Sequence, residues 1–319
     1  MSNKPPNFIH ISKAIDDEIN YIQKRSTGEI KSLRTPWSSW NNLYMDGWEY
    51  GWIVTIAGAS SMGKTTILNI LETEFYRLNT WDKFETLSFN FEMLARRLVG
   101  RKMSHYTALT VKELYSAGGK ALESNLINTL KTGFRDQFKD FPIFYYEHPR
   151  TPEQLLNIIL HFIKTRKLKQ QNKGLIITLD HVALANLAPG VSERLNIHNL
   201  MTVFNKVKKI YPKTLTILIS QLNREIEKPE RKSSYGKNAI LNFPTRSDIY
   251  MADSIFQTSD VVIVPHRPEV LGLISYGPKK WPTRNMVYCH HLKNREGSPI
   301  ITRLTPDLAR NTFKDLGNA

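Results

Sequence analysis

The feature that most constrains the fold is a glycine-rich segment, Gly58-Ala59-Ser60-Ser61-Met62-Gly63-Lys64-Thr65, which matches the pattern G-x-x-x-x-G-K-[ST] in full. The apolar residues 52–57 precede it and predict a strand, and residues 64–78 follow it and predict an amphipathic helix. In this strand–loop–helix context, backbone N–H groups and the N-terminus of the helix surround phosphate groups. The segment therefore predicts a site for a nucleoside triphosphate.

The residue types in this loop also predict individual roles. Lys64 would neutralise the β- and γ-phosphates of ATP, and Thr65 would bind Mg²⁺. ATP and Mg²⁺ are thus the expected ligands. We expect the nucleotide contacts to come from the loop and the residue after it: Gly58, Ala59, Ser60, Ser61, Met62, Gly63, Lys64, Thr65 and Thr66.

A second acidic element follows later in the chain. Residues 174–180 form an apolar stretch that ends in Asp180, and an acid at the end of a buried strand can hold the water shell of Mg²⁺. Many P-loop motors have a glutamate directly after this aspartate, but here the next residue is His181. Asp180 is therefore the second expected metal residue, and the general base must come from elsewhere.

Glu92 is the candidate general base. It ends the predicted strand 84–91, which we expect to lie beside the strand of the P-loop, so that Glu92 faces the γ-phosphate. The alternative is a glutamate that starts a helix and interacts with the helix dipole. Catalysis is the preferred interpretation because the sequence offers no better base.

Strand and helix patterns alternate from residue 52 onward, which predicts an α/β fold with a mostly parallel sheet covered by helices. We expect further helices from residue 151 and over residues 192–211, and helical segments up to about residue 138. The late strands should form hairpins at the edge of the sheet. The other predicted strands are 142–146, 174–180, 215–220, 261–264, 286–291 and 300–304.

The N-terminal segment predicts a separate element. Residues 1–11 resemble a loose tail, and Ser12 would cap a helix to about residue 25 in which Ile15, Ile19 and Ile22 form an apolar stripe. We expect residues 1–34 to be a tail and linker helix, and residues 35–319 to be the ATPase domain. The stripe would pack either on its own subunit or on the next one.

The charge balance indicates the kind of partner. The chain has 44 Lys and Arg against 29 Asp and Glu, a formal net charge of +15. Such an excess favours a polyanionic partner through attraction to phosphates, although solubility alone would also explain it. The position of the basic residues is therefore more informative than their number.

Several classes of site are excluded or disfavoured by residue type. The single cysteine, Cys289, rules out internal disulfides and a thiolate metal cluster, and its apolar surroundings predict a buried, inert thiol. The nine histidines show no metal-ligand spacing. No apolar run approaches the length of a membrane span, so a cytoplasmic, soluble protein is expected.

Four short stretches follow the P-loop in a fixed order: residues 90–93 (NFEM), 179–181 (LDH), 219–224 (ISQLNR) and 292–297 (LKNREG). Together with the loop, they resemble the ring-shaped replicative DNA helicases of bacteria and phages, the DnaB-like helicases of superfamily 4. The resemblance covers roughly residues 25–315. It implies a RecA-like P-loop NTPase core that assembles as a ring, which we expect to be a hexamer.

The resemblance also implies roles for residues outside the loop. Glu92 matches the family's catalytic glutamate, and Gln221 lies on the strand whose glutamine senses the γ-phosphate. Lys293 and Arg295 match the hairpin that offers a lysine and an arginine finger to the neighbouring subunit's ATP. They alternate on one strand and so point to the same face, but from residues alone a solvated charge pair would be the simpler interpretation.

The DNA-facing side is expected between the sensor strand and residue 253. The family's loop usually runs Asp-Leu-Arg-Glu-Ser-Gly, whereas residues 248–253 here are DIYMAD, so the arginine and the glycine are missing. Flexible lysines and arginines suit contact with a single strand of any sequence, and Tyr235 or Tyr250 could stack on bases. A charged surface loop is the alternative. The expected DNA-binding residues are Arg224, Lys228, Arg231, Lys232, Lys237 and Arg246.

Two other segments carry positive charge. Residues 164–169 are basic, but they end a helix, where cations interact favourably with the dipole, and a solvated surface is the preferred interpretation. Residues 186–199 could form a second channel loop, although Arg194 is their main positive charge.

The sequence thus predicts an ATP-dependent replicative helicase motor that moves along single-stranded DNA as a ring and unwinds duplex. A separate primase or loader is expected as a partner. One alternative is a recombinase-like or clock-like RecA ATPase. Another is an ATP-binding DNA clamp or loader partner without unwinding activity.

Overall fold

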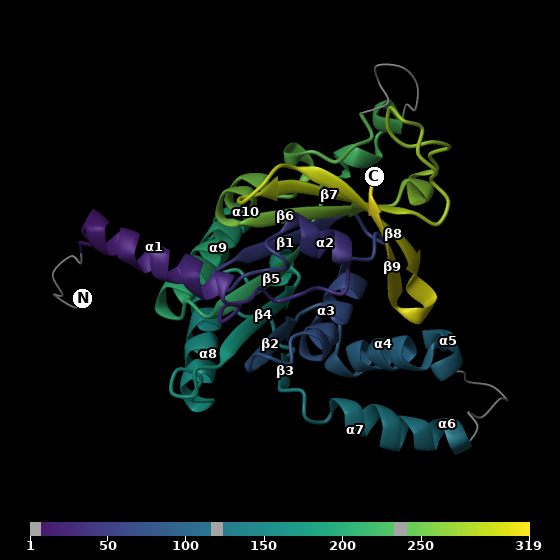
Figure 1. The fold of residues 1–319 in the computed structure, drawn as a ribbon. Coiled ribbons are helices and arrows are strands. Elements are labelled where there is room, and N and C mark those ends of the chain that lie inside the picture. Colours follow the sequence, from purple (N-terminus) through teal and green to yellow (C-terminus); the bar gives the residue numbers. More distant parts are fainter. Residues whose placement is uncertain (1–7, 116–123, 233–240) are drawn as a thin grey trace.

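A nine-stranded sheet forms the centre of the computed structural model, which describes residues 8–115, 124–232 and 241–319 (Figure 1). Its strand order is β3-β2-β4-β5-β1-β6-β7-β8-β9. The first six strands pair in parallel, and the last three pair antiparallel. The strands are β1 (Ile53–Gly58), β2 (Phe84–Asn90), β3 (Ile143–Tyr146), β4 (Gly174–Asp180), β5 (Thr214–Gln221), β6 (Val261–His266), β7 (Val287–Asn294), β8 (Ile300–Asp307) and β9 (Thr312–Asn318).

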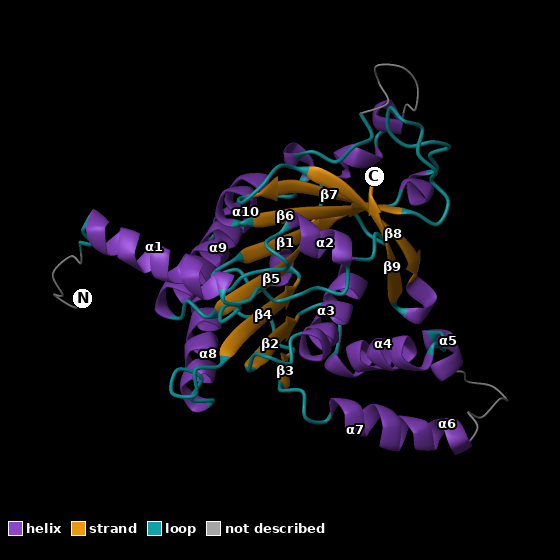
Figure 2. Cartoon of the chain, in the orientation of Figure 1, coloured by secondary structure: helices purple, strands orange, loops and turns teal. Residues whose placement is uncertain are grey.

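Helices cover both faces of this sheet (Figure 2). One face packs against α8 (Pro152–Thr165), α9 (Glu193–Ile210) and α10 (Ala252–Thr258). The other packs against α2 (Ser38–Leu43) and α3 (Lys64–Leu78). Beyond α3 lie α4 (Ala95–Thr107), α5 (Val111–Leu114), α6 (Ser124–Thr129) and α7 (Arg135–Phe138), the last two joined by the π-helical residues Leu130–Phe134.

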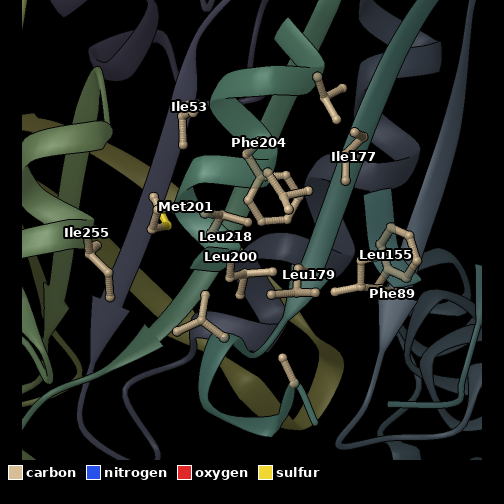
Figure 3. Close-up of a cluster of buried hydrophobic side chains, with 14 of the residues drawn as sticks. Ile53, Phe89, Leu155, Ile177, Leu179, Leu200, Met201, Phe204, Leu218 and Ile255 are labelled. Carbon is tan, nitrogen blue, oxygen red and sulfur yellow. The ribbon is translucent and has the colours of Figure 1, made fainter. Parts of the chain in front are cut away.

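The central strands are buried on both sides because they lie between these helical layers. In β1, Ile53 and Ala57 face the α8–α9 layer, whereas Val54 and Ile56 face α3. Figure 3 shows the first of these layers, in which Phe204 of α9 and Leu155 of α8 pack on strand residues. Such two-sided burial explains why the strands are continuous apolar runs.

The structure confirms the predicted α/β fold with C-terminal antiparallel strands at one edge, and it corrects three details. First, β2 is not beside β1, because β4 and β5 lie between them. Second, β9 is an additional strand that the sequence does not predict, because it is an edge strand without a strong apolar pattern. Third, the first helix, α1 (Ile11–Ser26), is capped by His10 rather than by Ser12.

Helix α1 projects from the body of the molecule (Figure 1), and none of its residues is buried. Ile15, Ile19 and Ile22 are 50, 50 and 56% exposed, so the stripe does not pack on its own chain. Contacts with the body lie near the C-terminal end of α1, where Arg25 and Tyr21 both bond to Glu49. Along the described chain, we find no helix that is both long and apolar enough to span a bilayer.

Candidate nucleotide-binding site

The P-loop connects β1 to α3, as the sequence predicts. Gly63 has φ +90°, and a Cβ there would lie 2.6 Å from the ring of Phe313 on β9, so only glycine fits. Lys64 begins α3, and its Nζ donates to the carbonyl oxygen of Ala59 at 2.8 Å. The loop therefore curls around the lysine, with the N-terminus of α3 at its base.

A cavity of about 610 Å³ opens above this loop. Of the predicted nucleotide residues, Ser60, Ser61, Gly63, Lys64, Thr65 and Thr66 line it, together with Glu92 and Gln221. Three predicted residues do not line it. Ala59 and Met62 pack in an apolar cluster beside the loop, and Gly58 belongs to β1.

Thr65 and Asp180 meet at the floor of the site. The Thr65 hydroxyl donates to Asp180 Oδ2 at 2.8 Å, while Oδ1 of the same carboxylate is buried without a hydrogen-bond partner. Burial raises the pKa of Asp180 from 3.8 to about 6. A hydroxyl beside a carboxylate with an unpartnered oxygen is an oxygen-only donor set, which fits Mg²⁺.

Desolvation also acts on the cation of the loop. It lowers the pKa of Lys64, and the negative charges of Asp180 and Glu92 oppose this only in part. A buried ammonium group of this kind gains from an added polyanion. The electrostatics of the cavity therefore favour a phosphate chain.

Gln221 and His181 form the side of the cavity next to the loop. Gln221 ends β5, where it is paired in register with Gly58 of β1, so the strand places it beside the P-loop. Its amide nitrogen lies 3.1 Å from Nε2 of His181. Burial lowers the pKa of His181, which keeps the imidazole neutral and available for hydrogen bonding near pH 7.

Glu92 reaches the same cavity by a different route from the one predicted. Asn90 of β2 is in register with Asp180 of β4, and the backbone N–H of Phe91 donates to the carbonyl oxygen of Asp180 at 3.0 Å. Glu92 therefore enters the site beside Asp180, from the neighbour of the β4 strand rather than from a neighbour of β1. Its side chain is exposed and lines the cavity.

Two cations of the cavity were missed by sequence reasoning. Arg101 of α4 and Lys112 of α5 line it, together with Leu308 and Ala309 from the turn between β8 and β9. The sequence holds no motif for them. Their placement depends on how α4, α5 and the C-terminal hairpin fold over the loop.

Lys293 and Arg295 lie at the opposite edge of the sheet from the P-loop. Asn294 pairs with Val261 at the start of β6, and Arg295 forms an ion pair of 3.2 Å with Asp260, whose carboxylate also accepts from the N–H of Ile53 at the start of β1. The P-loop follows the other end of the six-residue β1, roughly 17 Å away at about 3.3 Å per residue.

The residues predicted for DNA contact fall into three groups. Arg224 and Lys228 are exposed, and Lys228 pairs with Glu225 at 2.6 Å. Arg246 is half-exposed and pairs with Asp253 at 3.0 Å. The side chain of Lys232, and all of Tyr235 and Lys237, lie outside the described residues.

Arg231 differs from the prediction of a mobile, DNA-facing side chain. Its guanidinium forms two bonds, of 2.8 and 2.9 Å, to the buried carboxylate of Asp248, and it also donates to the carbonyl oxygens of Leu241 and Phe243. The altered segment 248–253 is likewise held internally, because the Tyr250 hydroxyl donates to Glu193 at 2.6 Å. Both contacts stabilise the fold of this side.

Comparison with known proteins places these observations in context. The chain matches a solved structure of an isolated ATPase domain with a TM-score of 0.74 and 18% identity, over 95% of this chain and 98% of that one. It matches "The Structure Of A DnaB-Like Replicative Helicase And Its Interactions With Primase" with a TM-score of 0.72 and 17% identity, over 97% of this chain and 68% of that one. These two likenesses show the fold.

A search of curated protein sequences finds no match. The sequence model of the DnaB-like helicase C-terminal domain, in contrast, matches residues 33–315, most of the chain. The matched region includes the P-loop, Asp180, Gln221 and the Lys293–Arg295 strand. The chain therefore belongs to the family of DnaB-like helicase C-terminal domains.

Proposed function

We propose that this chain is an ATP-hydrolysing motor that moves along single-stranded DNA as a ring and unwinds duplex DNA. The observation that supports this most directly is the convergence of Lys64, Thr65, Asp180, Glu92 and Gln221 on one cavity. Lysine, a hydroxyl–carboxylate pair and a free glutamate are the groups that phosphoryl transfer to water requires.

Each of these residues has a separate task in the proposed reaction. Lys64 binds the β- and γ-phosphates, and its lowered pKa returns toward the ordinary value when they arrive. Thr65 and Asp180 would hold Mg²⁺, which neutralises charge on the phosphates. Glu92 accepts the proton of the attacking water, and Gln221 donates a hydrogen bond to the γ-phosphate or the water.

Assembly as a ring is supported by two features of the chain. The Ile15, Ile19 and Ile22 stripe of α1 is exposed, so a second copy would gain from covering it. Lys293 and Arg295 lie roughly a strand's length from their own P-loop, so their proposed role on ATP requires a neighbouring subunit. We propose a hexamer with ATP at its subunit interfaces.

DNA binding is proposed for a set of cations that we call the basic segment, namely Arg224, Lys228 and Arg246, together with Lys232 and Lys237. Arg224 and Lys228 are exposed at the end of the strand that supplies Gln221, which gives a short path between DNA and the γ-phosphate. Arg231 is left out because Asp248 already holds its charge. A separate primase or loader is the proposed protein partner.

The test is ATP hydrolysis with and without single-stranded DNA. We expect DNA to stimulate hydrolysis by the parent chain, Lys64→Ala to abolish it, and Glu92→Gln to bind ATP with little turnover. Parent-rate hydrolysis by Glu92→Gln would show that the base has been assigned wrongly.

A forked duplex with a labelled strand separates the three candidate functions. A ring helicase displaces the strand with ATP, whereas a recombinase-like ATPase hydrolyses ATP on DNA without displacement. A clamp or loader partner binds DNA and ATP but does neither at a significant rate.

A further inference from the structure

Glu72 and Lys102 form a buried ion pair beside the nucleotide site. Lys102 Nζ on α4 lies 2.8 Å from Glu72 Oε2 on α3, and the two side chains are 5 and 2% exposed, in that order. The same ammonium group donates to the carbonyl oxygen of Asn69 at 3.0 Å and to its side chain. A buried ion pair is weak evidence for stability, because desolvation of both charges offsets their attraction. Its contacts indicate another role.

The second oxygen of Glu72 connects two strands of the site. Oε1 accepts from the Ser88 hydroxyl on β2 at 2.6 Å and from the Thr178 hydroxyl on β4 at 2.8 Å. Thr178 and Ser88 are also in contact, with their hydroxyl oxygens 2.8 Å apart. Ser88 lies four residues before Glu92, and Thr178 lies two residues before Asp180. The carboxylate therefore sets the spacing of β2 and β4 just below the cavity.

One carboxylate thus connects all four elements that supply the site. Helix α3 provides Glu72 itself and begins with Lys64 and Thr65, β4 ends in Asp180, and β2 leads into Glu92. Through Lys102, the carboxylate also holds α4, in which the preceding residue, Arg101, lines the cavity. Successive helical residues point about 100° apart, so Lys102 can face inward while Arg101 faces the nucleotide.

We propose that Glu72 and Lys102 are positioning residues for ATP hydrolysis, an inference that rests on the proposed function. Glu92 lies between β2 and α4, so the position of its carboxylate depends on how these two elements are held. The pair ties both to the P-loop helix. An error of about 1 Å in the placement of a catalytic group can cost roughly a hundredfold in rate, whereas binding of ATP to Lys64 depends on α3 alone.

The test compares a single variant with a double variant. Lys102→Met removes the tether and leaves Glu72 buried without its cation, so we expect both a lower Tm and a kcat reduced roughly 10- to 100-fold, with KM for ATP within about twofold of the parent. The double variant Lys102→Met/Glu72→Gln removes both buried charges, and the new amide oxygen still accepts from Ser88 and Thr178. Its Tm should recover toward the parent value while kcat stays low.

A matched control uses another buried carboxylate, on β2. Glu85 is fully buried and pairs with Arg166 at 2.6 Å and with Lys173 at 3.0 Å, at the end of the strand far from the cavity. Glu85→Gln should lower Tm without changing kcat, measured well below the melting temperature. This separates loss of stability from loss of positioning.

Each outcome decides one of the two ideas. A parent chain that hydrolyses no ATP, with or without single-stranded DNA, would overturn the proposed function and the positioning role together. An active parent with an equally active double variant would overturn the positioning role alone. If Lys102→Met does not fold, the double variant still decides, because it removes both charges of the pair.

Discussion

Asp180→Asn should make the chain more stable at pH 8 while it loses ATP turnover. The carboxylate is 3% exposed, and one of its oxygens has no hydrogen-bond partner. Burial raises its pKa from 3.8 to about 6. Asparagine has the same shape and can still accept from Thr65, but it removes the buried charge.

The magnitude follows from the pKa change. A shift from 3.8 to about 6 corresponds to about 3 kcal/mol by which the ionised carboxylate destabilises the folded chain at pH 8. The amide of asparagine would leave one N–H unpaired, which costs about 1 kcal/mol. We therefore expect a net gain of about 2 kcal/mol in the free energy of unfolding.

The sign of the pH dependence gives a second test. Because the pKa is raised in the folded state, the folded chain binds the proton more tightly, so this contribution to stability is fully present below pH 3.8 and is lost as pH rises through about 6. The advantage of Asp180→Asn over the parent should therefore shrink as the pH falls from about 6 toward about 4.

Urea unfolding without Mg²⁺ or nucleotide measures this difference. It should be done at one protein concentration, because subunit assembly adds concentration-dependent stability. Equal midpoints for parent and variant at pH 8 would refute the assignment of a buried, destabilising charge. Mg²⁺-dependent hydrolysis that persists in the variant would refute the role of Asp180 in holding the metal.

Three further predictions concern the ring, the DNA and the loop. Arg295→Ala should bind ATP but hydrolyse it poorly, and mixing it with Lys64→Ala subunits should restore some turnover, because certain mixed interfaces then pair an intact finger with an intact P-loop; full-speed turnover by Arg295→Ala would exclude a shared site. Neutralising the basic segment should flatten the salt dependence of DNA binding, measured by fluorescence anisotropy, without changing ATP affinity; an unchanged slope would place the DNA elsewhere. Gly63→Ala should abolish nucleotide binding in a titration with a fluorescent ATP analogue, since the added Cβ would meet Phe313 and the φ of +90° is strained for alanine; normal affinity would mean that the loop adapts.

Local sequence is sufficient for the elements whose structure depends on neighbouring residues. The strand Gly174–Asp180 has the bounds that its apolar pattern predicts, and helix α3 begins and ends where the pattern indicates. The P-loop is predictable for the same reason, since its glycines, its lysine and the helix after it are contiguous. Burial of Cys289 follows from its apolar strand, and the structure confirms it.

Contacts between distant segments are decided by the tertiary structure. The prediction that β2 adjoins β1 is wrong because strand order depends on how the crossover helices pack, which no local pattern specifies. For the same reason no motif predicts that Arg101 lines the cavity, or that Arg231 is bound by Asp248 rather than free. A cation shows its charge in the sequence, but only the fold determines whether a carboxylate, a phosphate or solvent lies opposite it.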